Sequence, residues 1–130
     1  MSQEIVAKLR YFRQGPRKMR LVVDMIRGRN VARALQILEL TNKKSARAIL
    51  KLLQSAVANA KHNFSLNEDN LRISKITVDG GPVLKRWMPK AHGRATPIRE
   101  RTSHINLYLS EFVKKEKINK KKVKEIKVKK

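Results

Sequence analysis

Few side chains in this sequence could do catalytic chemistry, and their spacing does not favour it. The three histidines, His62, His92 and His104, are 30 and 12 residues apart, with no carboxylate or cysteine at metal-ligand spacing. Ser103, His104 and Asp79 supply the residue types of a catalytic triad, but Ser103 lies outside any nucleophile-elbow motif. We therefore expect no metal site, no cofactor and no catalysed reaction, and we interpret Ser103 and His104 as part of a polar strand face.

The binding of polyanions is a better-supported chemistry, and it centres on the segment between Val83 and Thr102. This segment has little apolar content to fold around, yet it places Trp87 beside Lys85 and Arg86. An aromatic ring can stack on a nucleic-acid base while flanking cations contact phosphates. The alternative is a solvated loop, which would have no need of a tryptophan or of so many arginines.

The composition also indicates a nucleic-acid partner. The 130 residues include 32 Lys and Arg against 10 Asp and Glu, which gives a formal net charge of +22. A chain with this charge repels itself until a polyanion neutralises it. The sequence has no cysteine, which excludes disulfides and thiolate metal sites. No apolar window has the length of a signal peptide or a membrane span, so we expect a soluble cytoplasmic protein without a membrane partner.

The length is that of one domain with one modest core. Residues 1–110 hold the apolar patterning and are predicted to form that domain. Residues 111–130 are mostly Lys with scattered Ile, Val, Glu and Asn, and such a composition cannot bury enough apolar area to offset chain entropy. We expect a flexible Lys-rich tail there, either solvated or loosely bound to RNA.

The elements that must position these side chains follow from the apolar periodicity. Helical stripes predict helices over residues 17–27, over a short stretch that Asn30 can cap, and over residues 43–62, with Leu50 on the buried face of the last. Two-residue alternation predicts strands over residues 5–13, 71–78 and 104–109, with a bulge between Ile73 and Ile76. The predicted fold is α+β, with three helices packed on a small three-stranded antiparallel sheet.

The first predicted helix has two contrasting faces. Met19, Val22 and Ile26 form an apolar stripe, Pro16 suits the first helical position, and Gly28 suits the end. The opposite face is basic and is offset by a single aspartate. We expect phosphate contacts along this face, and a solvated face is the alternative. Its basic residues are Arg17, Lys18, Arg20, Arg27 and Arg29.

The segment over about residues 83–104 is predicted to be a long protruding β-hairpin, because the strands on either side of it should pair. Its turn is expected between Ala91 and Arg94, where Gly93 supplies backbone freedom. Arms of about 10 residues would reach roughly 33 Å. Pro97 removes a ladder donor, so we expect a bulge or a shift in register in the returning arm. A lone two-stranded ribbon is marginal in water, so anionic surroundings should order it.

Five separate blocks of the sequence resemble one known family. They read GPRKMRLVVDMIRG over 15–28, NKKSA over 42–46, SAVANAKHN over 55–63, GPVLKR over 81–86 and RTSHI over 101–105, with Pro89, Ala91 and Gly93-Arg94-Ala95 between the last two. In this order, and over roughly residues 5–110, they resemble the large-subunit ribosomal protein twenty-two family in its bacterial and organellar form.

The resemblance implies a fold and a function. The fold would be three helices on a three-stranded sheet with an extended hairpin, and residues 1–110 would be a single RNA-binding domain. The function would be structural: binding of large-subunit ribosomal RNA, assistance in subunit assembly, and lining of the polypeptide exit tunnel by the hairpin. The partners would be that RNA, neighbouring ribosomal proteins including large-subunit protein four, and transiently the nascent polypeptide. Macrolide antibiotics would pass nearby, and the ribosome would be cytoplasmic or organellar.

The residues and the resemblance together define two sets of candidate site residues. The set expected to bind RNA is Arg17, Lys18, Arg20, Arg27, Lys43, Lys44, Lys85, Arg86, Trp87, Lys90, Arg94, Arg99, Arg101 and His104. The set expected at the tunnel-facing tip of the hairpin is Met88, Lys90, Ala91, His92, Gly93 and Arg94.

Two other functions are less consistent with the sequence. A basic DNA-binding architectural protein would require a helix presented to the major groove or a dimer interface, and the sequence indicates neither. A small nucleic-acid enzyme would require paired carboxylates at useful spacing, which we do not find.

Overall fold

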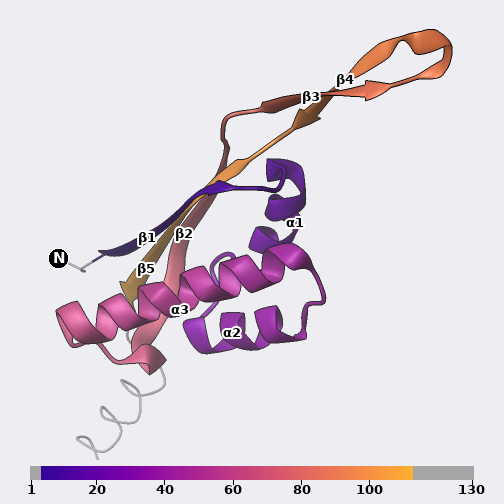
Figure 1. The fold of residues 1–130 in the computed structure, drawn as a ribbon. Coiled ribbons are helices and arrows are strands. Elements are labelled where there is room, and N and C mark those ends of the chain that lie inside the picture. Colours follow the sequence, from indigo (N-terminus) through magenta and orange to yellow (C-terminus); the bar gives the residue numbers. More distant parts are fainter. Residues whose placement is uncertain (1–3, 113–130) are drawn as a thin grey trace, which may run out of the picture.

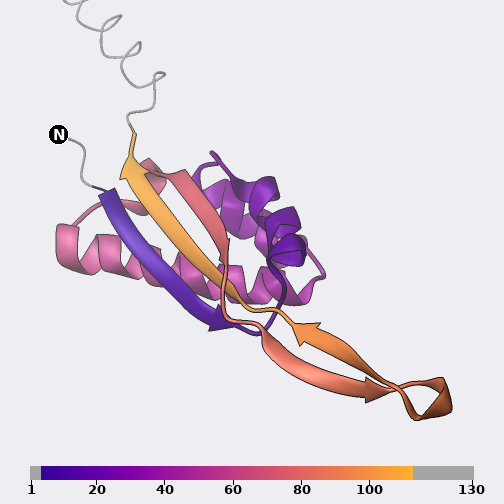
Figure 2. The same cartoon turned by 90° about the horizontal axis from the view of Figure 1, so that it is seen from above.

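The computed structural model describes residues 4–112, and over that range the chain adopts the predicted α+β fold (Figure 1). Three helices lie together on one face of a three-stranded sheet, and a two-stranded hairpin extends away from both layers (Figure 2). The elements are β1 (Glu4–Phe12), α1 (Pro16–Ile26), α2 (Val31–Leu40), α3 (Lys44–Phe64), β2 (Leu71–Gly80), β3 (Leu84–Pro89), β4 (Ala95–Glu100) and β5 (Ser103–Glu111), with 3-10 turns at Glu68–Asn70 and Ala91–Gly93.

The three-stranded sheet has β5 at its centre, with β1 and β2 antiparallel on either side of it. Alternate residues of β5 face the helices, and Ile105, Leu107 and Leu109 are fully buried. The register of β2 shifts between Ile73 and Lys75, which confirms the predicted bulge. A second irregularity, which the sequence pattern did not predict, lies near the end of β1.

The core lies between the helices and this sheet. The apolar stripe of α1 is wholly buried, as predicted, and the helix begins at Pro16. On α3 the buried face includes Leu52, while Leu50 is only half-buried. The buried face of this helix is therefore rotated slightly from the face that the sequence predicted. Asn30 stands at the N-cap of α2 without a side-chain capping bond; its backbone instead bridges to Arg72 of β2.

The paired strands of the hairpin are shorter and more regular than the expected arms of about ten residues. Strands β3 and β4 have six residues each, and the register runs unbroken from Leu84 opposite Glu100 to Pro89 opposite Ala95. The predicted bulge or shift at Pro97 was therefore wrong. The predicted turn was correct: it lies at Ala91–Gly93.

Antiparallel pairing explains why Pro97 is tolerated. The Lys90 amide donates to the Arg94 carbonyl at 2.7 Å, so these two residues form a hydrogen-bonded pair. Such pairs alternate along an antiparallel ladder. Pro89 and Pro97 therefore fall at positions whose backbone nitrogens face away from the partner strand, where a missing N–H removes no ladder bond.

The predicted domain boundary near Ser110 falls close to the end of β5, which includes Glu111. The Phe112 amide donates to the Asn70 carbonyl at 2.8 Å. The rest of the predicted Lys-rich tail, residues 113–130, lies outside the described residues. Between residues 4 and 112, none of the helices is long and apolar enough to span a bilayer.

Candidate nucleic-acid interface

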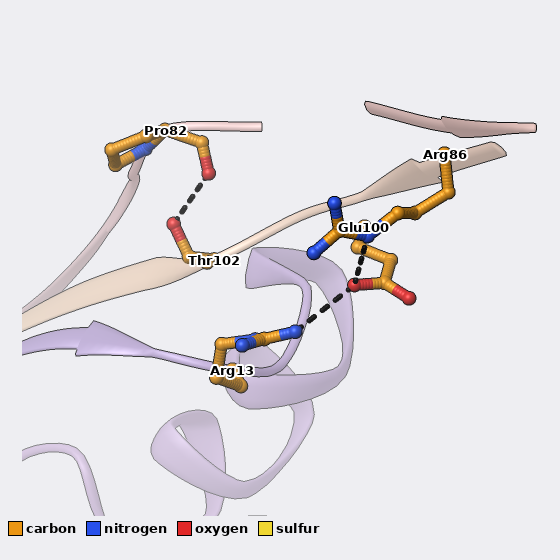
Figure 3. A network of polar contacts seen from close by, with 5 residues as sticks. All are labelled: Arg13, Pro82, Arg86, Glu100 and Thr102. Atoms are coloured by element: carbon orange, nitrogen blue, oxygen red, sulfur yellow. Dashed lines mark hydrogen bonds and ion pairs between the residues drawn. The ribbon is translucent and has the colours of Figure 1, made fainter. Parts of the chain in front are cut away.

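The base of the hairpin is tied to the body through Glu100 (Figure 3). Arg13, which follows β1, donates to the Glu100 carboxylate at 3.1 Å, and Arg86 of β3 lies 3.9 Å from the same oxygen. Both pairs are largely exposed, so each contributes at most about 1 kcal/mol to stability. Their structural effect is to hold a cation of the body and a cation of the hairpin on one carboxylate.

The strands that lead into the hairpin approach each other closely at Gly81. Its amide donates to the Thr102 carbonyl at 2.8 Å. The Thr102 hydroxyl donates to the Pro82 carbonyl at 2.7 Å (Figure 3). A Cβ atom on Gly81 would overlap the Thr102 hydroxyl and lie 3.2 Å from the His104 ring. Any larger residue at this position would therefore force Thr102 or His104 to shift.

A hollow of about 700 Å³ opens where the hairpin base meets the first turns of α1 and α3. This surface, called the basic hollow below, is lined by Arg13, Gln14, Gly15, Arg17, Lys18, Lys44, Arg99, Glu100 and Arg101. Five of these residues were expected to bind RNA, and they come from three separate stretches of the chain. Arg13 was not among the expected residues; its only sequence signal was its place at the end of a strand, just before a helix.

The charge of the basic hollow favours a polyanion. Six of the residues that line it are cationic and one, Glu100, is acidic. Cations packed around one hollow repel each other unless phosphates lie between them. The first residues of α1 and α3 also contribute, because neither helix has a side-chain cap and their free N–H groups favour an anion nearby.

Arg20 and Arg27 lie away from the basic hollow and hold α1 against β2. Arg20 donates to the Val78 carbonyl at 3.1 Å, and Arg27 donates to the Ile76 carbonyl at 3.2 Å. Arg27 also pairs with Asp24 at 3.0 Å. Each guanidinium has further N–H groups, so phosphate contact at these two residues stays a prediction. Lys43 is exposed at the N-cap of α3, immediately before the hollow.

The two faces of the hairpin differ in chemistry. Opposite residues of an antiparallel ribbon share a face, so Lys85, Arg99 and Trp87 lie on one side. Arg86 lies on the other side with Met88 and Ile98. Trp87 is 69% exposed, so its ring is free to stack. The ring is thus flanked on its own face by Lys85 and Arg99, while Arg86 faces the other way.

The residues expected at the tip are all exposed and lie at the far end of the hairpin from the body (Figure 1). His92 and Gly93 form the turn with φ angles of 61° and 69°. Lys90 and Arg94 flank the turn as a directly bonded backbone pair. The hairpin therefore presents two cations and an imidazole at its end.

Ser103 and His104 have structural partners. The buried Ser103 hydroxyl donates to the Gln14 carbonyl at 2.6 Å. His104 accepts from the Tyr11 amide through Nδ1 at 3.1 Å, and the two rings meet edge to face. The two residues are neighbours on β5 and point to opposite faces, so no triad forms. In the part of the chain that the structure describes, no three His, Asp or Glu side chains gather as metal ligands.

A family model described as ribosomal protein L22p/L17e matches residues 7–110, which is most of the chain and almost all of the folded body and hairpin. Members of this family are structural proteins of the large ribosomal subunit that bind its RNA and lie beside other ribosomal proteins. The match gives no support to the DNA-binding alternative. The chain belongs to the ribosomal protein L22p/L17e family, and it is a structural constituent of the large ribosomal subunit that binds ribosomal RNA.

Proposed function

We propose that this protein lines the polypeptide exit tunnel with its hairpin, while the basic hollow binds RNA at the hairpin base and assists subunit assembly. The observation that carries the proposal is the cross-strand pair Lys85 and Arg99, two cations directly opposite each other beside an exposed Trp87. Like charges at opposite positions destabilise a ribbon. A hairpin built this way is stabilised when RNA phosphates lie against that face and a base stacks on the ring.

The opposite face and the tip of the hairpin suit the tunnel lumen. Met88 and Ile98 are 48% and 38% exposed, and they share their face with Arg86, which is drawn toward Glu100. The tip adds Lys90, His92 and Arg94. On this proposal the tip lies near large-subunit protein four and near the path of the nascent chain and of macrolide antibiotics.

The role in assembly follows from where the basic hollow lies. It combines side chains of α1, α3 and the hairpin base, so one RNA segment bound there contacts the body and the hairpin together. Phosphate contacts fix position and orientation rather than read sequence. Binding in the hollow would therefore orient the hairpin relative to the RNA before the subunit closes around it.

Hydroxyl-radical footprinting of large-subunit RNA tests this function. The comparison is between the full chain and a hairpin-deleted variant in which an Asn-Gly turn replaces residues 85–99 and joins Leu84 to Glu100. We expect the full chain to protect nucleotides of the tunnel wall that the variant leaves exposed. Protection by the body should persist in the variant and weaken only where Arg99 lines the basic hollow. Protection confined to surface helices in both proteins would remove the tunnel function and leave only RNA binding.

A further inference from the structure

A second hollow lies between β1 and α3, and the function proposed above does not use it. It is a groove of about 510 Å³, a size typical of sites for small organic groups. Its floor is apolar and is formed by Leu9 and Phe12 of β1 and Leu52 of α3. Leu9 and Phe12 are only half-buried, so the groove leaves part of an aromatic ring open to an occupant.

The rim of this β1–α3 groove is cationic. Lys8 lies on the β1 side, and Lys44, Arg47 and Lys51 lie on successive turns of α3. Among the described residues that line the groove, none is acidic. The rim therefore favours a negatively charged occupant, while the floor favours an apolar or aromatic group.

Lys44 lines both the β1–α3 groove and the basic hollow. A polyanion that lies in the hollow can thus continue along α3 to the groove without leaving a cationic surface. Single-stranded RNA complements both parts of the groove. Its phosphates are negatively charged and suit the cationic rim, and its unstacked bases are flat and aromatic and suit the apolar floor. The Ser55 hydroxyl, at the end of the groove, can bond a base edge.

We propose that the β1–α3 groove holds an unstacked base of a single-stranded RNA segment, with the neighbouring phosphates on Lys8, Lys44, Arg47 and Lys51. This inference rests on the proposed path of RNA through the basic hollow. It adds a site at which the protein captures a base as well as the backbone, on the side of the body formed by β1 and α3.

The test compares two labelled RNAs of 12 nucleotides with the same phosphates, one intact and one lacking its four central bases. Binding to the full chain is measured by fluorescence anisotropy, and every protein carries Trp87→Ala so that the hairpin ring does not contribute. Ser55→Leu fills the groove from an exposed helical position, where leucine is well tolerated. Gln54→Leu is the matched control, because Gln54 is exposed on the same helix and does not line the groove.

We expect the Trp87→Ala protein and the Gln54→Leu control to bind intact RNA about tenfold more tightly than abasic RNA, as one stacked base would give. Ser55→Leu should reduce that ratio to near one and leave binding of the abasic RNA unchanged. Three results would overturn the proposal. The affinity ratio could be near one in the Trp87→Ala protein, the tenfold ratio could persist in Ser55→Leu, or Ser55→Leu could weaken the binding of both RNAs equally.

Two further outcomes distinguish base capture from the binding of a different partner. A labelled peptide of alternating Glu and Leu that binds more tightly than intact RNA, and loses its binding in Ser55→Leu, would assign the groove to an acidic protein segment and overturn the proposal. Failure of every protein to bind either RNA at low salt would overturn the proposed RNA path itself. That result is distinct from the loss of the base-dependent ratio alone.

Discussion

At the scale of single residues, the structure shows a glycine where two strands approach closely and a tryptophan with an exposed ring. Gly81 lets two strands approach closely below the hairpin, and Trp87 presents a ring on one face of it. The sequence predicted that Trp87 stacks on a base, because it lies beside Lys85 and Arg86 in a segment with little apolar content. The Gly80-Gly81 pair indicated only a turn, because the contact with Thr102 and His104 joins residues about twenty positions apart.

The packing at Gly81 predicts a clear effect on stability. Gly81→Ala should lower the free energy of unfolding by about 1–3 kcal/mol, because its Cβ overlaps the Thr102 hydroxyl and crowds His104. Urea denaturation followed by circular dichroism measures this loss. Gly80→Ala is the control, since a Cβ there would meet the Pro16 ring at an ordinary 3.9 Å. Equal stability of the two variants would show that the close approach is not rigid.

The division of the hairpin into two faces predicts different roles for adjacent residues. Trp87→Ala should weaken binding to large-subunit RNA by about 1–3 kcal/mol through loss of stacking, without changing its salt dependence. Met88→Ala, on the other face, should leave RNA affinity nearly unchanged. Filter-binding titrations at several salt concentrations check both expectations. Equal losses for the two variants would mean that RNA contacts both faces.

At the scale of elements, the ends of the first helix follow from residues at those ends, whereas the length of the hairpin depends on contacts between distant parts of the chain. Pro16 begins α1, and Gly28 follows it in a left-handed conformation with φ 73°, both readable from the sequence. The bulge of β2 was also readable, from the change in phase between Ile73 and Ile76. The length of the hairpin arms was not, because it depends on where the strands separate at Gly81 and Thr102. The predicted bulge at Pro97 was wrong because a proline disrupts a strand only where its backbone nitrogen faces the partner strand, and that depends on the pairing register.

The exposed hairpin predicts that the body folds without it. In the variant that replaces residues 85–99 with Asn-Gly, the helical circular dichroism signal should be unchanged and the free energy of unfolding should fall by less than about 1 kcal/mol. The reason is that side chains of β3 and β4 are exposed except for the half-buried Leu84. Leu107→Ala, in the buried centre of the sheet, should cost about 2–5 kcal/mol in the same assay. Loss of helical signal on deletion would make the hairpin part of the folding unit.

At the scale of the whole molecule, the fold is a compact body that supports a projecting basic ribbon (Figures 1 and 2). Net charge predicted the class of partner, and five separate sequence blocks predicted the family. The basic hollow could not be located from sequence, because Arg17, Lys44 and Arg99 become neighbours only when α1, α3 and the hairpin base are assembled. Arg13 was missed for the same reason, since its role depends on Glu100.

On the function proposed above, ribosomal RNA binds in the basic hollow and does not merely follow the net positive charge of the protein. The salt dependence of RNA affinity, measured for two variants with equal loss of charge, distinguishes these two modes of binding. One variant removes three cations of the hollow: Arg17→Gln, Lys18→Gln and Lys44→Gln. The other removes three exposed cations elsewhere: Arg33→Gln, Arg72→Gln and Lys75→Gln.

Each lost phosphate contact lowers the slope of log affinity against log salt by about 0.7–0.9. The hollow variant should therefore lose about two units of slope, and the variant with cations removed elsewhere should lose less than one. Circular dichroism and urea denaturation establish that both variants are folded. Equal slopes in the two variants would show that RNA binding follows net charge and not the arrangement of charge that the fold creates, and would exclude the basic hollow as the RNA site.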